Sequence, residues 1–291
     1  MKAAPFTYHS PQTRAELLTL LGDLDNARVL AGGQSLMPLL NLRLAAPDHL
    51  IDLNGVKDLD HIEIVGDRLR IGAMVRQRTA ERSPIVAAAC PLLVEALQHV
   101  GYQQTRNRGT IGGSIAHMDP TAELAVVAKV TDARLALQSR RGSRELSFDE
   151  FAAGYLATMI EPDEILAHVE FKCWPQHHGW AFHEVTRRGE SFSMVSGAAL
   201  IELDADGAIR QAALVVGGLG AVPMRVAEAE SLLRGKVFND DMRFAAGSAA
   251  ERLPAEGDLY ASAEYKQHLA AVLISRTLAK AVSRARRSDR V

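Results

Sequence analysis

The first half of the chain carries short stretches in which apolar and polar residues alternate, as in strands with one buried face. Residues 62–65 and 68–71 alternate on either side of Gly66-Asp67, which predicts a β-hairpin. A second pair of strands is predicted around Gly142. The strands of this second pair are expected at residues 134–139 and 144–146. Single strands are expected at residues 28–30, 50–53 and 164–172.

Helical spacing separates these strands, with helices expected over residues 10–23, 36–42, 75–100 and 119–129. Ser10-Pro11 and Asp119-Pro120 are each expected to be the N-cap and first residue of a helix. Ser35 is expected to cap the short helix that begins at residue 36. The pattern favours an α+β arrangement in this half.

The second half begins with three segments predicted to form the strands of an antiparallel meander, at residues 180–187, 196–203 and 209–217. Three helices are predicted after them, at residues 224–233, 242–253 and 262–286. The segment 175–179 contains Pro and Gly and is the best candidate for a boundary, giving domains at residues 1–175 and 176–291. Strands and helices do not alternate regularly enough for a doubly wound parallel fold.

The composition argues against several classes of function. Among 291 residues, 33 Lys and Arg stand against 35 Asp and Glu, which argues against binding of nucleic acid through a large basic surface. The N-terminus lacks the apolar core of a signal peptide, and no window approaches the roughly 20 apolar residues of a membrane helix. A cytoplasmic location is therefore expected. The arginines near the C-terminal end are expected to be solvated: Arg284, Arg286, Arg287 and Arg290.

Cysteine is scarce, since Cys90 and Cys173 are the only two, and both are expected to be small buried hydrophobic residues. Two isolated thiols cannot ligate an iron–sulfur cluster or build a structural zinc site. His117, His177 and His178 make no convincing metal set, because no carboxylate or cysteine lies at ligand spacing. We expect no metal on this chain.

The most informative residues form two glycine-rich loops, Ala31-Gly32-Gly33-Gln34-Ser35-Leu36 and Thr110-Ile111-Gly112-Gly113-Ser114. Paired glycines remove Cβ atoms, so backbone N–H groups can converge on an anion at close range. A site fed by two such loops suits an elongated diphosphate better than a lone phosphate. Neither loop is a Walker A loop, and neither fits the Gly-x-Gly-x-x-Gly of a Rossmann site.

The sequence around both loops resembles the FAD-binding (medium) subunits of molybdenum hydroxylases, of the carbon monoxide dehydrogenase, xanthine dehydrogenase and quinoline oxidoreductase type. Residues 31–38, followed by Asn41-Leu42-Arg43, are similar to the first FAD loop of that family. Residues 106–117, followed by residues 119–123, are similar to the second. Three later segments agree in order: Arg187-Arg188-Gly189-Glu190, residues 217–220 with Pro223-Met224-Arg225, and residues 265–269.

This resemblance implies a two-lobed FAD-binding domain of the vanillyl-alcohol-oxidase type, followed by a small domain of three-stranded antiparallel sheet plus helical bundle. It also implies a division of labour. A large molybdopterin subunit would hydroxylate the substrate, and a small iron–sulfur subunit would carry [2Fe–2S] clusters. This chain would bind FAD non-covalently and pass electrons to an external acceptor, within a dimer of heterotrimers. No residue of this chain is expected to act as a catalytic acid or base.

The resemblance also assigns residues to the flavin. The first loop is expected at the diphosphate, and the second at the diphosphate and ribityl chain with Ile111 against the flavin. Glu123 matches an acidic position near the adenosine end. Ile165 and Leu166 match a position where an apolar residue packs on the ring, and His183 matches a lysine near the isoalloxazine in eukaryotic xanthine oxidoreductases. Residues 188–192 are expected to be a mobile loop beside the ring, gated by Phe192 or Tyr155.

Simpler interpretations stay open for several of these residues. Either glycine pair alone would be an ordinary turn. Glu123 has a sufficient structural role at a helix N-terminus. A solvated or interface role for Arg106 and Arg108 is as consistent with the sequence as an approach to phosphate. For the whole chain, the alternatives are a self-contained FAD-dependent oxidase or reductase and a scaffold that has lost its cofactor.

Overall fold

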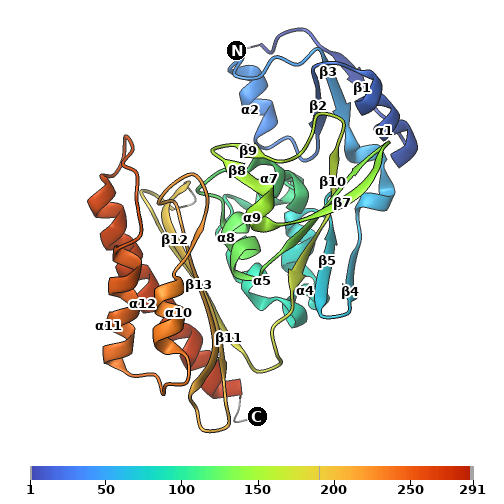
Figure 1. Cartoon of the computed structure of the whole chain (residues 1–291). Coiled ribbons are helices and arrows are strands. Elements are labelled where there is room, and N and C mark those ends of the chain that lie inside the picture. Colours follow the sequence, from blue (N-terminus) through green and yellow to red (C-terminus); the bar gives the residue numbers. More distant parts are fainter. Residues whose placement is uncertain (1, 190, 289–291) are drawn as a thin grey trace.

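The computed structural model describes residues 2–189 and 191–288. Figure 1 shows two lobes built from the first part of the chain and a third body, built from the last part, beside the second lobe. The expected α+β class is confirmed, because strands and helices occur in separate groups rather than in regular alternation. Glu190 and Arg290, which belong to two of the sequence features above, lie outside the described residues.

A parallel three-stranded sheet forms the first lobe. Its strands are β1 (Thr7–His9), β2 (Ala27–Leu30) and β3 (His49–Asp52), in the order β1-β3-β2. Helix α1 (Arg14–Asp23) connects β1 to β2, and α2 (Leu36–Asn41) lies between β2 and β3. Two 3₁₀ turns follow β3, at Leu53–Gly55 and Lys57–Leu59. The parallel pairing brings the carboxyl ends of β2 and β3 to the same edge, where the first glycine loop leaves the sheet.

The predicted start of the first helix is wrong. Thr13, not Ser10, is the N-cap, and its hydroxyl accepts a hydrogen bond from the backbone N–H of Glu16 at 3.2 Å. The Glu16 carboxylate accepts in return from the backbone N–H of Thr13. This reciprocal capping box satisfies two of the amides at the helix start, which favours it over the Ser10-Pro11 pair.

The second lobe is built on an antiparallel sheet of five strands in the order β4-β5-β10-β6-β7. The strands are β4 (Ile62–Val65), β5 (Arg68–Gly72), β6 (Arg134–Ser139), β7 (Gly142–Ser147) and β10 (Ile165–Lys172). The helices are α3 (Gln77–Arg82), α4 (Pro84–Ala89), α5 (Pro91–Leu97), α6 (Gln103–Arg108), α7 (Ile111–His117), α8 (Glu123–Val130) and α9 (Phe148–Phe151). A small hairpin, β8 (Ala152–Gly154) with β9 (Ala157–Thr158), completes the lobe.

Helix α8 also begins later than predicted. The Asp119 carboxylate accepts hydrogen bonds from the backbone N–H of Thr121 at 2.8 Å and from its hydroxyl at 2.6 Å. Asp119 therefore closes a local turn instead of capping a helix at Pro120. Ala122 is the N-cap, without a side-chain hydrogen bond, and Glu123 is the first helical residue.

The third body is an antiparallel sheet covered by helices. Its strands are β11 (Gly179–Thr186), β12 (Ser193–Leu203), β13 (Ile209–Gly217) and the short β14 (Met224–Arg225), in that order. The helices are α10 (Ala227–Leu233), α11 (Asp240–Glu251) and α12 (Ala263–Ser288). The three predicted strands are confirmed. Residues 224–225, predicted to be helical, instead pair with β13 as a fourth strand.

Both faces of this last sheet are buried. On one face Phe182, Leu200 and Val215 belong to the same core cluster as Leu93 of α5 and Leu124 of α8. The opposite face packs on α10, α11 and α12 in a second cluster. Burial on both sides explains the nearly continuous apolar runs within β12 and β13. No helix among the described residues is long and apolar enough to cross a membrane.

Candidate functional site

The two glycine loops, far apart in sequence, touch each other in the fold. A Cβ atom built on Gly32 would stand 2.3 Å from the carbonyl oxygen of Arg108, and one built on Gly113 would stand 3.4 Å from the Cβ of Ala31. Gly33 has a φ of +75°, a left-handed conformation that glycine adopts without strain. Glycine is therefore needed in the first loop both for close approach and for backbone conformation.

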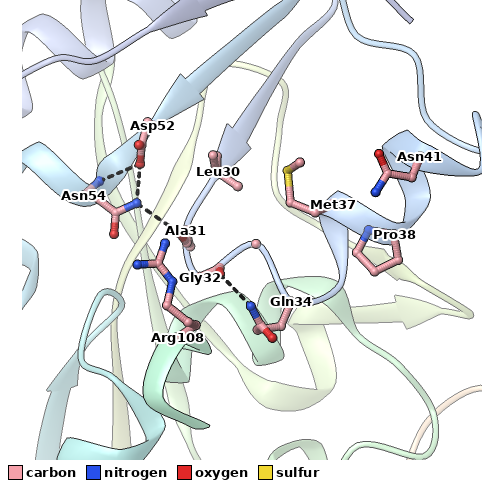
Figure 2. A pocket seen from close by; sticks show the side chains of 11 residues that line it. Leu30, Ala31, Gly32, Gln34, Met37, Pro38, Asn41, Asp52, Asn54 and Arg108 are labelled. Carbon is pink, nitrogen blue, oxygen red and sulfur yellow. Dashed lines mark hydrogen bonds between the residues drawn. The ribbon is translucent and has the colours of Figure 1, made fainter. Parts of the chain in front are cut away.

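A cavity of about 450 Å³ opens where the loops meet. In Figure 2, Asn54, Ala31 and Arg108 lie at one side of it, and Met37, Pro38 and Asn41 of the α2 segment lie at the other. The cavity is lined by Leu30, Ala31, Gly32, Gly33, Gln34, Met37, Pro38, Asn41, Asp52, Asn54 and Arg108. Its wall thus comes from the first loop, the carboxyl end of β3 and the segment that leads into the second loop.

The two loops differ in whether their backbone amides are hydrogen-bonded within the protein. In the part of the chain that the structure describes, the N–H groups of residues 32–35 donate no hydrogen bond to another protein group. In the second loop, by contrast, the N–H of Gly112 donates to Ala73 O at 3.0 Å and that of Gly113 to the Thr110 hydroxyl at 2.9 Å. The first loop thus presents unpaired donors to a ligand. The glycines of the second loop allow the start of α7 to pack closely, since a Cβ on Gly112 would meet the Cβ of Ala73 at 2.4 Å.

Two arginine side chains bring positive charge to the cavity or close to it. The exposed Arg108 lines the cavity, and Arg76 lies behind it, where burial and the neighbouring Arg108 charge lower the pKa of the Arg76 guanidinium. One carboxylate, Asp52, also lines the cavity. Its oxygens accept from the Tyr8 hydroxyl at 2.5 Å and from the backbone N–H of Asn54 at 2.9 Å. The hydrogen bond to Asp52 raises the pKa of Tyr8. A site with free amides and a free guanidinium fits an anionic ligand.

Comparison with known proteins identifies the family. A model described as "FAD binding domain in molybdopterin dehydrogenase" matches residues 4–171, and one described as "CO dehydrogenase flavoprotein C-terminal domain" matches residues 180–281. The 6-hydroxypseudooxynicotine dehydrogenase complex subunit alpha of Paenarthrobacter nicotinovorans is 36% identical, over 98% of this chain and 97% of its own. The chain belongs to the FAD-binding medium subunits of the molybdenum hydroxylase family.

Further relatives agree in sequence and in structure. The carbon monoxide dehydrogenase medium chain of Hydrogenophaga pseudoflava is 34% identical, over 96% of this chain and 98% of its own. The crystal structure of quinoline 2-oxidoreductase from Pseudomonas putida 86 contains a chain that superposes with a TM-score of 0.94 at 34% identity, covering 98% of this chain and 99% of that one. The match over whole chains confirms the resemblance on which the FAD and fold expectations rested.

The residues of this medium subunit fit FAD, the cofactor of its family. Unpaired amides in the first loop and the guanidinium of Arg108 match a diphosphate, and side chains at Gly32 or Gly113 would collide with neighbouring atoms. When bound, FAD supplies the redox chemistry, and the protein supplies its position and electrostatic environment. Molybdenum and iron–sulfur groups belong to other subunits in this family. No cluster of three or more potential metal ligands exists among the described residues.

Only some of the predicted site residues line the cavity. Residues 31–34 line the cavity, whereas Ser35 and Leu36 follow it at the start of α2, and Ser35 makes no side-chain cap. Thr110 caps α7, and Ile111 is fully buried in the core, so its side chain offers no surface to a ligand in this conformation. Ile165 packs in the cluster beneath the first loop and Leu166 in the cluster of Ile111, each almost buried. Their flavin contacts stay predictions.

Glu123 and His183 lie outside the wall of the cavity. Glu123 is half-buried at the head of α8, where burial raises its pKa to about 8, and the carboxylates of Glu184 and Asp119 act in the same direction. His183 lies on β11, with its Nδ1 3.3 Å from the hydroxyl of Thr277 on α12. Burial and the nearby Lys280 charge lower the pKa of His183. A flavin contact by either residue stays a prediction.

Several residues of the family motifs have structural contacts. Lys266 of α12 is buried, and its Nζ donates to Gly218 O at 3.1 Å and pairs with Asp258 at 2.9 Å, which ties the glycine turn after β13 to the segment before α12. The Arg187 guanidinium lies over the Tyr260 ring, 4.9 Å from its centroid. Phe192 is 79% exposed, so its side chain is free to meet a partner or ligand.

Sequence reasoning missed Asp52, Asn54 and Arg76. It placed Met37, Pro38 and Asn41 in the segment that resembles the first FAD loop but assigned them no contact. Asp52 lies within the strand predicted at residues 50–53 and Asn54 directly follows it. A parallel pairing of this strand with the one at residues 28–30 would have brought both residues to the first loop. Arg76 carries no such signal, because it lies in a loop between β5 and α3 and reaches the site only through tertiary packing.

Proposed function

We propose that this medium subunit receives electrons from the [2Fe–2S] clusters of a small partner subunit and passes them through FAD to an external acceptor. The observation that carries the proposal is the first loop, where residues 32–34 have unpaired backbone amides and line a cavity beside Arg108. The whole chain has only two cysteines, fewer than the four ligands of one cluster, so the electron donor would lie on another chain.

We further propose which residues hold the cofactor. The diphosphate would be bound by the amides of residues 32–35 and by Arg108, with Thr110 and Ser114 approaching from α7. The remaining predicted contacts are Ala31, Leu36, Ile111, Gly112, Gly113, Glu123, Ile165, Leu166 and His183. The division at residues 175–179 into an FAD domain and a C-terminal domain is part of the same proposal, as is a cytoplasmic location.

The proposed assembly contains a large molybdopterin subunit and the small iron–sulfur subunit, as a dimer of heterotrimers. Relatives are named for nicotine, 6-hydroxypseudooxynicotine, caffeine and carbon monoxide. The first three are N-heterocyclic or derived from one, which favours an aromatic N-heterocycle as the substrate of the assembly. Substrate choice would lie in the molybdenum subunit, since among the described residues Asp52 is the only carboxylate that lines this cavity and no histidine does.

The test compares the isolated chain with the assembled complex. The purified chain, loaded with FAD, is mixed anaerobically with nicotine, caffeine or carbon monoxide while the flavin absorbance is followed, with dithionite as the positive control. We expect bleaching by dithionite only. A tagged chain recovered from its source cells should bring molybdenum and iron with it. Bleaching of the isolated chain by an organic donor would contradict the proposal and favour a self-contained flavin oxidase or reductase.

A further inference from the structure

Arg76 joins the two glycine loops without lining the cavity. One terminal nitrogen of its guanidinium donates to the carbonyl oxygen of Arg108, and the other donates to the side-chain oxygen of Asn54. The Asn54 amide nitrogen in turn donates to the carbonyl oxygen of Ala31 at 3.3 Å. Arg76 also forms an isolated β-bridge with Thr110. One side chain therefore connects the first loop with the segment that leads into the second.

The charge of Arg76 is poorly matched by its surroundings. The side chain is partly buried, and the guanidinium of Arg108 lies close enough to lower the pKa of Arg76, an effect that Asp60 and Asp52 only partly offset. Within residues 2–189 and 191–288, the Arg108 side chain has no acceptor. Two neighbouring like charges cost free energy that a bound dianion would recover. This arrangement is therefore suited to a doubly charged ligand.

We infer that Arg76 is a positioning residue of the FAD site, which fixes the two glycine loops against each other through Arg108 O and Asn54 and places a second positive charge behind the diphosphate. The inference rests on the assignment of the first loop to the FAD diphosphate proposed above. The planar guanidinium suits this task because it donates to two acceptors at once in a fixed geometry. Lysine would keep the charge but lose the fixed fork.

Arg106 provides a matched control from the neighbouring helix. Its guanidinium pairs with Glu81 at 2.9 Å and donates to the carbonyl oxygens of Val100 and Gly101 at 3.0 and 2.8 Å. Arg106 is thus as well bonded as Arg76, but none of its partners lines the cavity. If the loss of arginine hydrogen bonds in general weakened FAD binding, substitution of either arginine would do so. If the position of the glycine loops matters, only substitution of Arg76 would weaken FAD binding.

The experiment uses the full chain with Arg76→Gln, Arg76→Lys and Arg106→Gln. Thermal unfolding without FAD is measured first, and then the Kd values for FAD and riboflavin, at low and high salt. We expect Arg76→Gln to weaken FAD binding about 10- to 100-fold, as for loss of a charged hydrogen-bonding group, with little change for riboflavin, which lacks the diphosphate. Arg76→Lys should recover part of this loss. The FAD Kd of Arg76→Gln should also depend less steeply on salt than that of the wild type.

Arg106→Gln should lower the unfolding temperature and leave the FAD Kd near the wild-type value. Equal FAD affinities for Arg76→Gln and Arg106→Gln, or an equal loss of FAD and riboflavin binding, would overturn the inference. If Arg76→Gln does not fold, Arg76→Lys decides: weaker FAD binding supports the inference and an unchanged Kd refutes it. Failure of the wild-type chain itself to bind FAD would overturn the proposed function, and the inference with it.

Discussion

The carbonyl oxygen of Arg108 lies 2.3 Å from the position that a Cβ atom on Gly32 would take, and the Cα of Gly109 lies 2.8 Å from it. Contacts this short leave no room for a side chain, so the first loop meets the chain ahead of the second only because residue 32 is glycine. This contact closes one wall of the cavity. It also makes the geometry of the first loop depend on residues more than seventy positions away in the sequence.

Gly32→Ala should therefore disturb both stability and cofactor binding. We expect a loss of about 1–3 kcal/mol in the free energy of unfolding, typical of an overpacked site, because backbone atoms must move. FAD affinity should fall as the amides of the first loop shift. Gly66→Ala is the control, since no atom lies near the Cβ position of Gly66. Gly66 has a positive φ (+60°), which Gly32 lacks, so the control adds backbone strain without a collision. FAD binding as tight in Gly32→Ala as in the wild type would contradict this account.

Glu123 should make the stability of the FAD-free chain depend on pH. Burial raises its pKa from 4.5 to about 8. Between these values the native chain holds a proton that the unfolded chain releases, so stability falls as pH rises through this window. Glu123→Gln should remove this loss. Because the side chain is only half-buried, we expect a gain of about 1–3 kcal/mol at about pH 8, fading near about pH 4.

Denaturant titrations of the wild type and Glu123→Gln over this pH range measure the effect directly. The difference between the two proteins isolates the contribution of Glu123 from that of the other ionisable groups of the chain. A difference that stays constant with pH would show that Glu123 is ionised in the native chain. The helix N-terminus would then outweigh burial.

Glu95 should contribute stability with the opposite pH dependence. It connects α5 with α12 through Lys280 at 2.7 Å and through Arg284. Burial disfavours its ionised form, but hydrogen bonds from Arg284 and Lys280 outweigh burial and lower its pKa. A lowered carboxyl pKa stabilises the fold above the unfolded value of 4.5, and this contribution is lost as pH falls through the folded value. Glu95→Gln should cost about 1–3 kcal/mol at about pH 7 and little in acid.

An exposed ion pair gives the control for Glu95. Glu145 pairs with Arg134 at 3.3 Å, and the two side chains are 45% and 52% exposed. Glu145→Gln should change the free energy of unfolding by about 0–1 kcal/mol at either pH. Equal effects of the two substitutions, measured by urea titration, would show that the contact between α5 and α12 adds no more than a surface pair.

The local patterns predicted most elements and the location of the first loop. Gly66-Asp67 marks the β4–β5 hairpin, and the three segments predicted as a meander form β11, β12 and β13. The predicted helix starts were wrong because more than one side chain near each start is able to cap a helix. Thr13 caps α1 in place of Ser10, and Asp119 closes a local turn instead of capping α8. Contacts that single residues outside the two loops make with the site depend on tertiary packing. Arg76 reaches the site through Arg108 and Asn54, and no spacing along the chain encodes that meeting.

The second glycine loop shows a different limit of sequence reasoning. Paired glycines after a turn predicted a cradle of free amides, but the amides of Gly112 and Gly113 are already bonded to Ala73 and Thr110. Gly112 is required there because α7 begins against residue 73, and a Cβ on Gly113 would stand 2.7 Å from the Thr110 hydroxyl. The same residue pattern therefore leaves the backbone amides unpaired in the first loop and hydrogen-bonded in the second, while both loops need glycine for close packing.

The most direct test of the account is a titration of the purified full chain with FAD and, separately, with riboflavin, followed by tryptophan and flavin fluorescence. We predict saturable binding of one FAD per chain and much weaker binding of riboflavin, which lacks the diphosphate that we propose the first loop binds. Equal affinity for the two flavins, or no binding of FAD by a chain shown to be folded, would contradict the assignment of this cavity to the FAD diphosphate.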